Sequence, residues 1–284
     1  MILDILLDGI IDTLKLIPFL FIAFLIIELI EHKLKNKEIL TKSGKLGPII
    51  GSILGGIPQC GFASLATNLY VTRIISLGTL ISIYLATSDE MLPIMISEQV
   101  EFTFILKIIL VKVLIGMVCG LIIDLIYSKK KKESFNLCKE DNCHCHEKNH
   151  SLIVSSIKHT FNIAIYILIV NLILNAIFEL GLEKILENLL LQNSIFGPFM
   201  ASLIGLIPNC ASSVIITELY LSSSLSFGSL LAGLLTNSGI ALVILFKSNK
   251  DLKENLTILT LIYLIGAILG IITNLIWFSF QNSI

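Results

Sequence analysis

The chain has 284 residues, of which 55% are hydrophobic and only 14% charged, and its formal net charge is −1. Its mean hydropathy is +0.91. A soluble globular protein carries about a quarter charged residues, so this composition excludes an ordinary soluble enzyme. The small net charge also argues against nucleic acid as a partner. We therefore expect a multi-pass protein of the cell membrane, with the lipid bilayer as its surroundings.

Eight hydrophobic blocks are long enough to enter or cross a bilayer, which takes roughly 20 apolar residues per helix. In chain order these blocks are 10–30, 46–72, 75–97, 102–127, 152–180, 196–221, 225–247 and 255–280. Two of them are interrupted, at Pro58 and at Pro208. Proline removes a backbone donor and disfavours a helical conformation in the residue before it. Each interrupted helix should therefore break into two short halves.

The distribution of charge indicates how these blocks cross the membrane. Lysine is concentrated between the blocks in three segments: 31–45, 128–150 and 247–253. Lysine-rich loops stay on the cytoplasmic side. If every block crossed once, the first two of these segments would lie on opposite sides. If the two interrupted blocks are re-entrant hairpins, all three segments are cytoplasmic. We therefore favour re-entrant hairpins, which give each half three transmembrane helices plus one hairpin.

The sequence contains an internal repeat. Residues 47–88 align with residues 197–238 without a gap, at an offset of 150, and share Gly-Pro, Pro-x-Cys and Leu-Tyr pairs. The same register places Gly116-x-x-x-Gly120 opposite Gly266-x-x-x-Gly270. Shared apolar composition does not explain so many matches in one register. The repeat indicates a duplicated membrane unit.

The repeat predicts the domain organisation and the fold class. Residues 1–127 would form the first membrane repeat, 128–150 a cytoplasmic linker, and 151–284 the second repeat. An odd number of crossings in each half turns the second repeat upside down relative to the first. We therefore expect an all-α polytopic membrane protein with an inverted-topology repeat, which is typical of secondary transporters. The alternative is a duplication that only builds a rigid scaffold.

The predicted substrate site lies at the two hairpin tips, Pro58-Gln59-Cys60 and Pro208-Asn209-Cys210. A helix break leaves backbone carbonyl and N–H groups without partners, and in a bilayer these must find protein, water or ligand. The helix dipole favours a thiolate at Cys60 and Cys210, and a thiolate beside free carbonyls suits a soft or borderline metal ion. The alternative is that both cysteines are small buried residues in tight packing.

Asp89 and Glu90 lie well inside the block 75–97. A carboxylate at that depth is costly unless it is paired or used. Lys112, on the following helix, is the natural counter-charge. We include both acids in the predicted transport site, where either one would carry a coupling proton or cation; a structural ion pair is the alternative.

The linker combines thiols and imidazoles that suit Zn²⁺, Cu⁺ or a similar ion. These candidate ligands are Cys138, Cys143, His144, Cys145, His146 and His150. Their spacing fits no closed zinc-finger pattern, so we expect a chelating linker for metal capture or sensing. Thiols on the cytoplasmic side stay reduced, which argues against disulfides. The alternative is a His/Cys-rich linker that holds no metal, and no obligatory cofactor is expected.

The motifs at 55–62 (Gly-Gly-Ile-Pro-Gln-Cys-Gly-Phe) and 205–213 (Gly-Leu-Ile-Pro-Asn-Cys-Ala-Ser-Ser), with the His/Cys linker between them, resemble those of the ten-transmembrane heavy-metal exporters. Members of that family carry the labels arsenic efflux permease or manganese transporter. The resemblance covers nearly the whole chain and implies export of a metal or metalloid. Six crossings plus four hairpin arms give the ten segments.

We therefore expect a secondary active permease that exports a heavy metal or metalloid by alternating access, and not an enzyme. The sequence has no Walker-type nucleotide-binding motif, so an ion gradient or the membrane potential would supply the energy. Two alternatives stay open: a carrier of anions or sulfur compounds that bind the helix N-termini, and a membrane metal sensor or enzyme that works through the linker. Assembly into a homo-oligomer is also left open.

Overall fold

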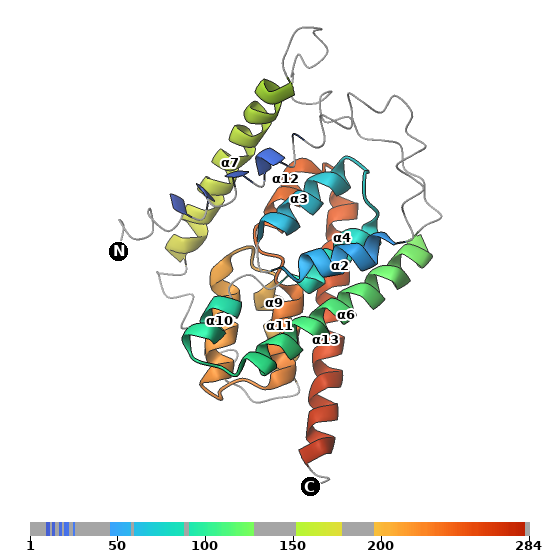
Figure 1. Cartoon of the computed structure of the whole chain (residues 1–284), viewed down its shortest axis with the longest axis vertical. Helices are drawn as coiled ribbons and strands as arrows, with labels where there is room; N and C mark the ends of the chain where they lie inside the picture. The colour runs from blue at the N-terminus through green and yellow to red at the C-terminus, as the bar shows by residue number, and fades with distance from the viewer. Residues whose placement is uncertain are drawn as a thin grey trace.

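The structure is a computed structural model of the whole chain (Figure 1). It describes residues 46–57, 60–87, 91–127, 152–177 and 196–281, together with single positions between 10 and 25. Every secondary-structure element within these ranges is a helix. The predicted all-α fold class is thereby confirmed for the part of the chain that the structure describes.

The first half contains five described helices in sequence. They are α2 (Gly47–Gly55), α3 (Cys60–Val71), α4 (Leu77–Ala86), α5 (Met91–Ser97) and α6 (Phe102–Tyr127). Pro48 stands in the first turn of α2, where its missing N–H costs nothing. Ser76 begins α4, because its hydroxyl accepts a hydrogen bond from the Thr79 N–H at 3.2 Å.

The second half repeats this series. After α7 (Leu152–Ile177), its helices are α9 (Gly197–Gly205), α10 (Cys210–Leu221), α11 (Phe227–Thr236), α12 (Ala241–Ser248) and α13 (Leu252–Gln281). Each of the last five begins 150 residues after its counterpart in the first half. The internal repeat seen in the sequence is therefore also a repeat of helices.

Hydrogen bonds that begin equivalent helices are repeated as well. The Ser226 hydroxyl accepts from the Ser229 N–H at 3.2 Å, as Ser76 does in the first half. The Gly78 N–H donates to Asp124 Oδ1 at 2.8 Å, and the Gly228 N–H donates to Asn274 Oδ1 at 2.9 Å. The two halves thus begin α4 and α11 by the same device.

Both interrupted blocks break where proline predicts. α2 ends at Gly55 and α3 begins at Cys60, while α9 ends at Gly205 and α10 begins at Cys210. Each half also has a second break that the sequence analysis did not predict. The blocks 75–97 and 225–247 each consist of two helices, because α4 ends at Ala86 and α11 ends at Thr236.

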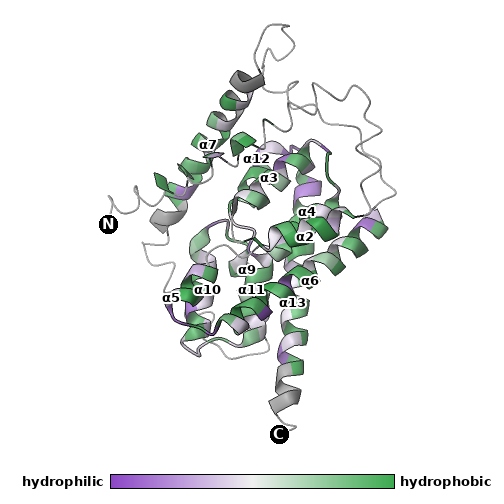
Figure 2. Ribbon diagram, in the orientation of Figure 1, coloured by the Kyte–Doolittle hydropathy of each residue, from purple (hydrophilic) through white to green (hydrophobic). Residues whose placement is uncertain are grey.

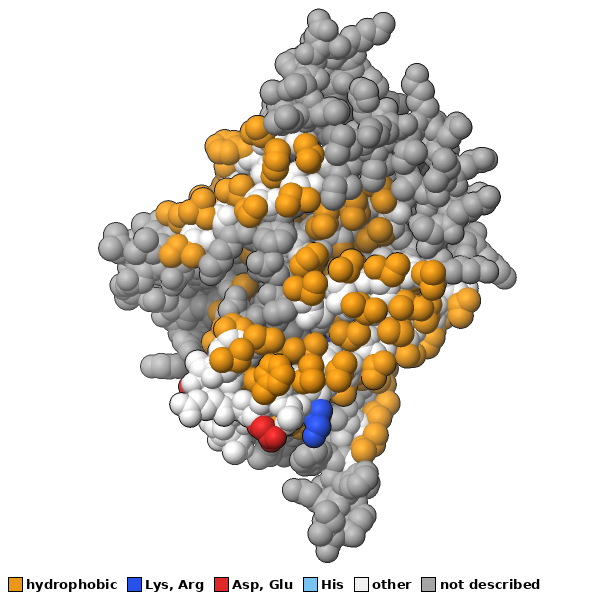
Figure 3. All heavy atoms as spheres, viewed as in Figure 1, with side chains coloured by type: hydrophobic (Ala, Val, Ile, Leu, Met, Phe, Trp, Pro, Cys, Tyr) orange, Lys and Arg blue, Asp and Glu red, His pale blue; other side chains and the backbone are white. Residues whose placement is uncertain are grey.

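Among the residues that the structure describes, four helical segments are long and apolar enough to cross a membrane: Leu77–Ser97, Phe102–Tyr127, Phe227–Ser248 and Leu252–Ile276. α6 and α13 keep one face buried and expose a second apolar face along their length, as lipid-facing helices do. Figure 2 shows apolar residues throughout the helices, and Figure 3 shows apolar side chains spread over the face that α2 and α6 form. The chain is a polytopic membrane protein.

Glycines let the helices of each half approach closely. A Cβ atom added at Gly120 of α6 would lie 2.6 Å from the Gly78 carbonyl oxygen of α4. In the second half, a Cβ atom at Gly270 of α13 would lie 2.6 Å from the Gly228 carbonyl oxygen of α11. The two GxxxG pairs therefore serve the close packing of α4 on α6 and of α11 on α13.

The contacts between the two halves are reciprocal: a helix of each half packs on a helix of the other. Helix α12 of the second half packs on α3 of the first, and α5 of the first packs on α10 of the second. Single residues follow the same rule: Tyr70 donates a hydrogen bond to Glu254, and the counterparts of these two residues, Tyr220 and Phe104, stack with ring centroids 6.1 Å apart. Reciprocal contacts of this kind, between i and j′ and between i′ and j, are those that a two-fold relation between two units produces.

The long helices of the two halves differ in direction in Figure 1. α6 rises from the lower centre to the upper right, whereas α13 descends from the top to the C-terminus at the bottom. α7 lies beside α12, and Lys247 Nζ sits 4.8 Å from the centre of the Tyr166 ring. The core clusters combine residues of both halves, so the two repeats share buried cores.

Candidate functional site

The Pro-x-Cys turn of the second half begins α10. The Asn209 side chain accepts a hydrogen bond from the Ala211 N–H at 2.8 Å, and its backbone carbonyl accepts one from the Ser212 hydroxyl at 2.8 Å. Asn209 is buried, and Cys210 is half-buried as the first residue of the helix. The dipole of α10 and its first N–H groups are thus directed at the position of Cys210.

The turn of the first half has the same place in the repeat. Cys60 is the first residue of α3, as Cys210 is of α10. Pro58, Gln59 and the side chain of Cys60 lie outside the described residues. Leu206, next to the second turn, packs on the core cluster that includes Ala63 of α3. The second turn therefore borders a core to which α3 of the first half also contributes.

The second break of each half lies between α4 and α5 and between α11 and α12. Asp89 and Glu90, which follow α4 in the sequence, lie outside the described residues. In the break of the second half, the Asn237 side chain accepts from the Gly239 N–H at 2.9 Å, and Gly239 has a φ of 53°. The Ser238 hydroxyl is completely buried and has no hydrogen-bond partner.

Lys112 of α6 joins the two second breaks. Its side chain is fully buried, and its ammonium donates to the Thr87 carbonyl, just after α4, and to the Leu234 carbonyl of α11, the latter at 2.7 Å. The pairing of Lys112 with Asp89 and Glu90, expected from the sequence, stays a prediction. The structure adds a contact with both halves that no local pattern indicated.

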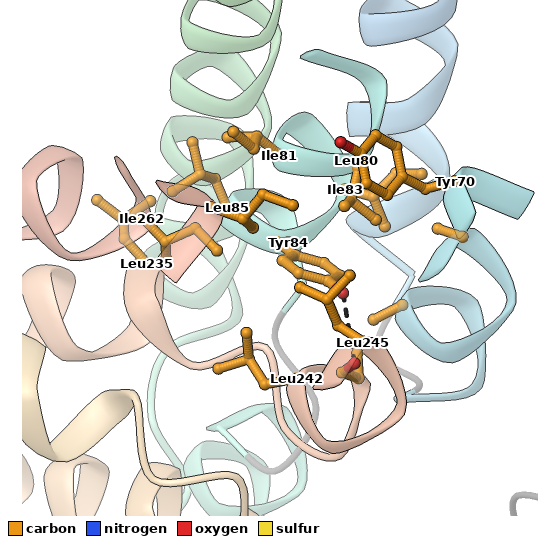
Figure 4. Packing of buried hydrophobic residues seen from close by; sticks show 14 of the residues in the cluster. Tyr70, Leu80, Ile81, Ile83, Tyr84, Leu85, Leu235, Leu242, Leu245 and Ile262 are labelled. Carbon is orange, nitrogen blue, oxygen red and sulfur yellow. Dashed lines mark hydrogen bonds between the residues drawn. The ribbon is translucent and has the colours of Figure 1, made fainter. Parts of the chain in front are cut away.

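Tyr84 fixes the junction of three helices from the two halves (Figure 4). Its ring is completely buried on α4, and its hydroxyl lies 2.6 Å from the Thr67 hydroxyl of α3. The same hydroxyl donates to the Ala241 carbonyl at the start of α12, at 3.4 Å. Around the ring, Leu242 and Leu245 of α12 close the cluster. The junction holds α12 against α3 close to the second break.

The predicted metal-binding linker, with Cys138, Cys143, His144, Cys145, His146 and His150, lies outside the described residues. Among the residues that are described, no group of three or more His, Cys, Asp or Glu side chains gathers in one place. A metal site with several protein ligands is therefore not found within the helical part of the chain that the structure describes.

The sequence does hold a local signal for the second breaks. Polar residues stand together in the middle of two apolar blocks, at 87–90 and at 237–239. Gly239 adds a residue that readily adopts a positive φ. A run of such residues within a membrane helix indicates an unwound segment as much as a pair of buried charges.

Comparison with known proteins identifies the family. The chain matches the family model described as "Putative, 10TM heavy-metal exporter" over residues 1–187 and 150–281. No curated protein and no solved structure matches the chain. The two matched ranges together include both Pro-x-Cys turns, both second breaks and the linker. The chain therefore belongs to this family of ten-transmembrane heavy-metal exporters.

Proposed function

We propose that the protein is a secondary active permease that carries a heavy metal or metalloid ion, of the manganese or arsenic type, out of the cell by alternating access. The substrate would bind where the two Pro-x-Cys turns meet, with the Cys60 and Cys210 thiolates and nearby backbone carbonyls as ligands. Gln59 and Asn209 would line this site, and Asp89 or Glu90 would carry a coupling proton.

The observation that carries this proposal is the set of helix breaks at equivalent places in both halves. Helices break before Cys60 and before Cys210, and again after Ala86 and after Thr236. Non-helical backbone at membrane depth is tolerated only where it is buried in protein or lines a water-filled cavity. In secondary transporters, such discontinuous helices form the substrate and ion sites near the membrane midplane.

The approximate two-fold relation between the halves supports the inverted repeat. The exchanged pairs Tyr70–Glu254 and Phe104–Tyr220 fit a two-fold axis, and in Figure 1 α6 rises whereas α13 descends. With both helices crossing the bilayer, such an axis lies in the membrane plane. Two halves related in this way can rock against each other and open the site to one side at a time.

The thiol site is tested with a Cys60→Ser/Cys210→Ser double variant in a metal-sensitive host. Growth is measured on manganese, zinc, cadmium, cobalt, arsenite and antimonite salts, together with the amount of protein in the membrane. We expect the double variant to lose resistance while its membrane level is unchanged. Cys119→Ser, which removes a half-buried thiol of α6, is the matched control and keeps full resistance. Full resistance in the double variant would refute the thiol site.

The same cells separate the remaining alternatives. Uptake assays with thiosulfate-type anions, run beside the metal panel, distinguish an anion carrier from a metal exporter. Deletion of residues 133–150 tests the linker, which we propose captures metal on the cytoplasmic side. A transporter keeps much of its flux after this deletion and needs a higher cytoplasmic metal concentration, whereas a sensor loses its response altogether.

A further inference from the structure

Lys112 is the one described lysine with no exposed surface, and its surroundings explain how a charge is tolerated there. Its side chain is 0% exposed. The ammonium donates to the Thr87 carbonyl from the first half and to the Leu234 carbonyl from the second, the latter at 2.7 Å. A buried charge is costly unless it is paired, so these contacts form a built site for a cation.

The two carbonyls are left free by the second breaks. In an unbroken helix, the Thr87 carbonyl would accept from the N–H of Met91 and the Leu234 carbonyl from that of Ser238. α4 ends at Ala86 and α11 ends at Thr236, so neither helix continues far enough to supply that bond. The negative ends of two helix dipoles therefore meet at one ammonium, at the contact between α4 and α11.

A buried lysine occurs at this position in the first half only. The counterpart of Lys112 on α13 is Ile262, which is also 0% exposed and lies in an apolar cluster. Ser238, whose buried hydroxyl has no hydrogen-bond partner, adds a further oxygen atom within the second-half break. Among the described residues, the ammonium of Lys112 thus contacts a carbonyl of each half at the second breaks.

We infer that Lys112 is a tethered cation, which occupies the place where two converging helix C-termini would otherwise bind Na⁺. In secondary transporters, unwound carbonyls and the C-terminal ends of half-helices coordinate Na⁺. The lysine ammonium carries the same charge and cannot leave. The inference rests on the proposed transport function and deepens it: the exporter works without Na⁺ at this site, and Lys112 holds the broken helices of the two halves together.

The test measures unfolding temperature and needs no substrate, so it stands even if the proposed function fails. The purified full chain is heated in detergent with NaCl or with choline chloride at equal ionic strength. We expect the wild type to unfold at the same temperature in both salts. Lys112→Met should unfold about 5 °C lower in choline chloride, because two buried carbonyls lose their donor, and should recover part of this loss in NaCl.

Lys107→Met is the matched control, since it removes an exposed lysine five residues earlier on the same helix. It should leave the unfolding temperature unchanged in both salts. If Lys112→Met cannot be purified in either salt, Lys112→Arg, which keeps the cation, replaces it and should behave as the wild type. A wild type that Na⁺ stabilises would overturn the inference. So would a Lys112→Met variant that loses no stability, or that gains none from Na⁺.

A second measurement connects the inference to transport. Metal resistance of cells with the wild type should be the same in sodium and potassium media, and Lys112→Met should lose resistance in potassium medium. If the wild type confers no metal resistance in either medium, the proposed function fails while the result from unfolding is unaffected. If resistance requires sodium in the wild type, the tethered-cation inference fails while the exporter stands.

Discussion

Arg73 and Glu254 form a bidentate salt bridge between the two halves of the chain. Nη1 of Arg73 lies 2.6 Å from Oε1 of Glu254, and Nη2 lies 2.7 Å from Oε2. Arg73 adopts a φ of 62° in the loop before α4, and its guanidinium lies 5.1 Å from the centre of the Tyr70 ring. The hydrogen bonds that the guanidinium donates to Glu254 raise the pKa of Arg73, so the guanidinium stays charged.

Removal of this ion pair should loosen the contact between the halves. Both side chains are largely buried, with 22% and 12% exposed, so we expect Glu254→Gln to lower the free energy of unfolding by about 2 kcal/mol. A double-mutant cycle with Arg73→Gln measures the coupling between the two residues. Lys253→Gln, at an exposed neighbouring position on α13, is the control and should have little effect. Additive effects in the cycle would contradict this prediction.

The counterpart contact on the other half is aromatic. Tyr220 stacks on Phe104 with an angle of 6° between the rings, and Phe227 packs against both. The Tyr70–Glu254 and Phe104–Tyr220 contacts would close the proposed substrate site toward opposite sides of the membrane. Glu254→Gln and Phe104→Ala should then each open the site toward a different side. We expect labelling of Cys210, as the sole remaining cysteine, by a membrane-impermeant maleimide to rise from the cytoplasmic side for the first variant and from the outside for the second.

Close helix packing predicts that replacing an equivalent glycine in either half destabilises the protein to a similar extent. Gly120→Ala and Gly270→Ala each place a methyl group 2.6 Å from a backbone carbonyl of the neighbouring helix. The neighbouring helix would have to shift to relieve this clash, so each substitution should lower the free energy of unfolding by about 1–3 kcal/mol. Val118→Ala changes a side chain that is 54% exposed on α6 and serves as the control. Chemical denaturation in detergent checks the prediction, and an unchanged midpoint for either glycine variant would contradict it.

The two halves supply a matched comparison at the start of α4 and α11. Asp124 accepts from the Ser76 hydroxyl at 2.6 Å and from the Gly78 N–H at 2.8 Å, whereas the second half uses Asn274 for the equivalent backbone bond. Asp124→Asn should therefore be nearly neutral. Asp124→Ala removes the acceptor and should cost about 1–2 kcal/mol in the free energy of unfolding. Equal losses for the two variants would show that the charge matters more than the hydrogen bond.

The breaks show how far local sequence information reaches. Pro58 and Pro208 predict their breaks because a missing N–H acts within one turn of helix, whatever surrounds it. The breaks after Ala86 and Thr236 contain no proline. Their carbonyls are satisfied by Lys112, which lies 25 residues from Thr87 and 122 residues from Leu234. A helix end stabilised from another helix leaves only a weak local signal.

Sequence by itself determined the membrane class, the repeat at an offset of 150 and the two proline breaks. These follow from hydrophobicity, from identity in register and from the chemistry of single residues, all of which act locally. Only the tertiary structure decided that α12 packs on α3, that Lys112 joins α4 to α11 and that Arg73 binds Glu254. Such contacts join side chains far apart in the chain, 181 residues for Arg73 and Glu254, and they stabilise the protein only once the halves are assembled.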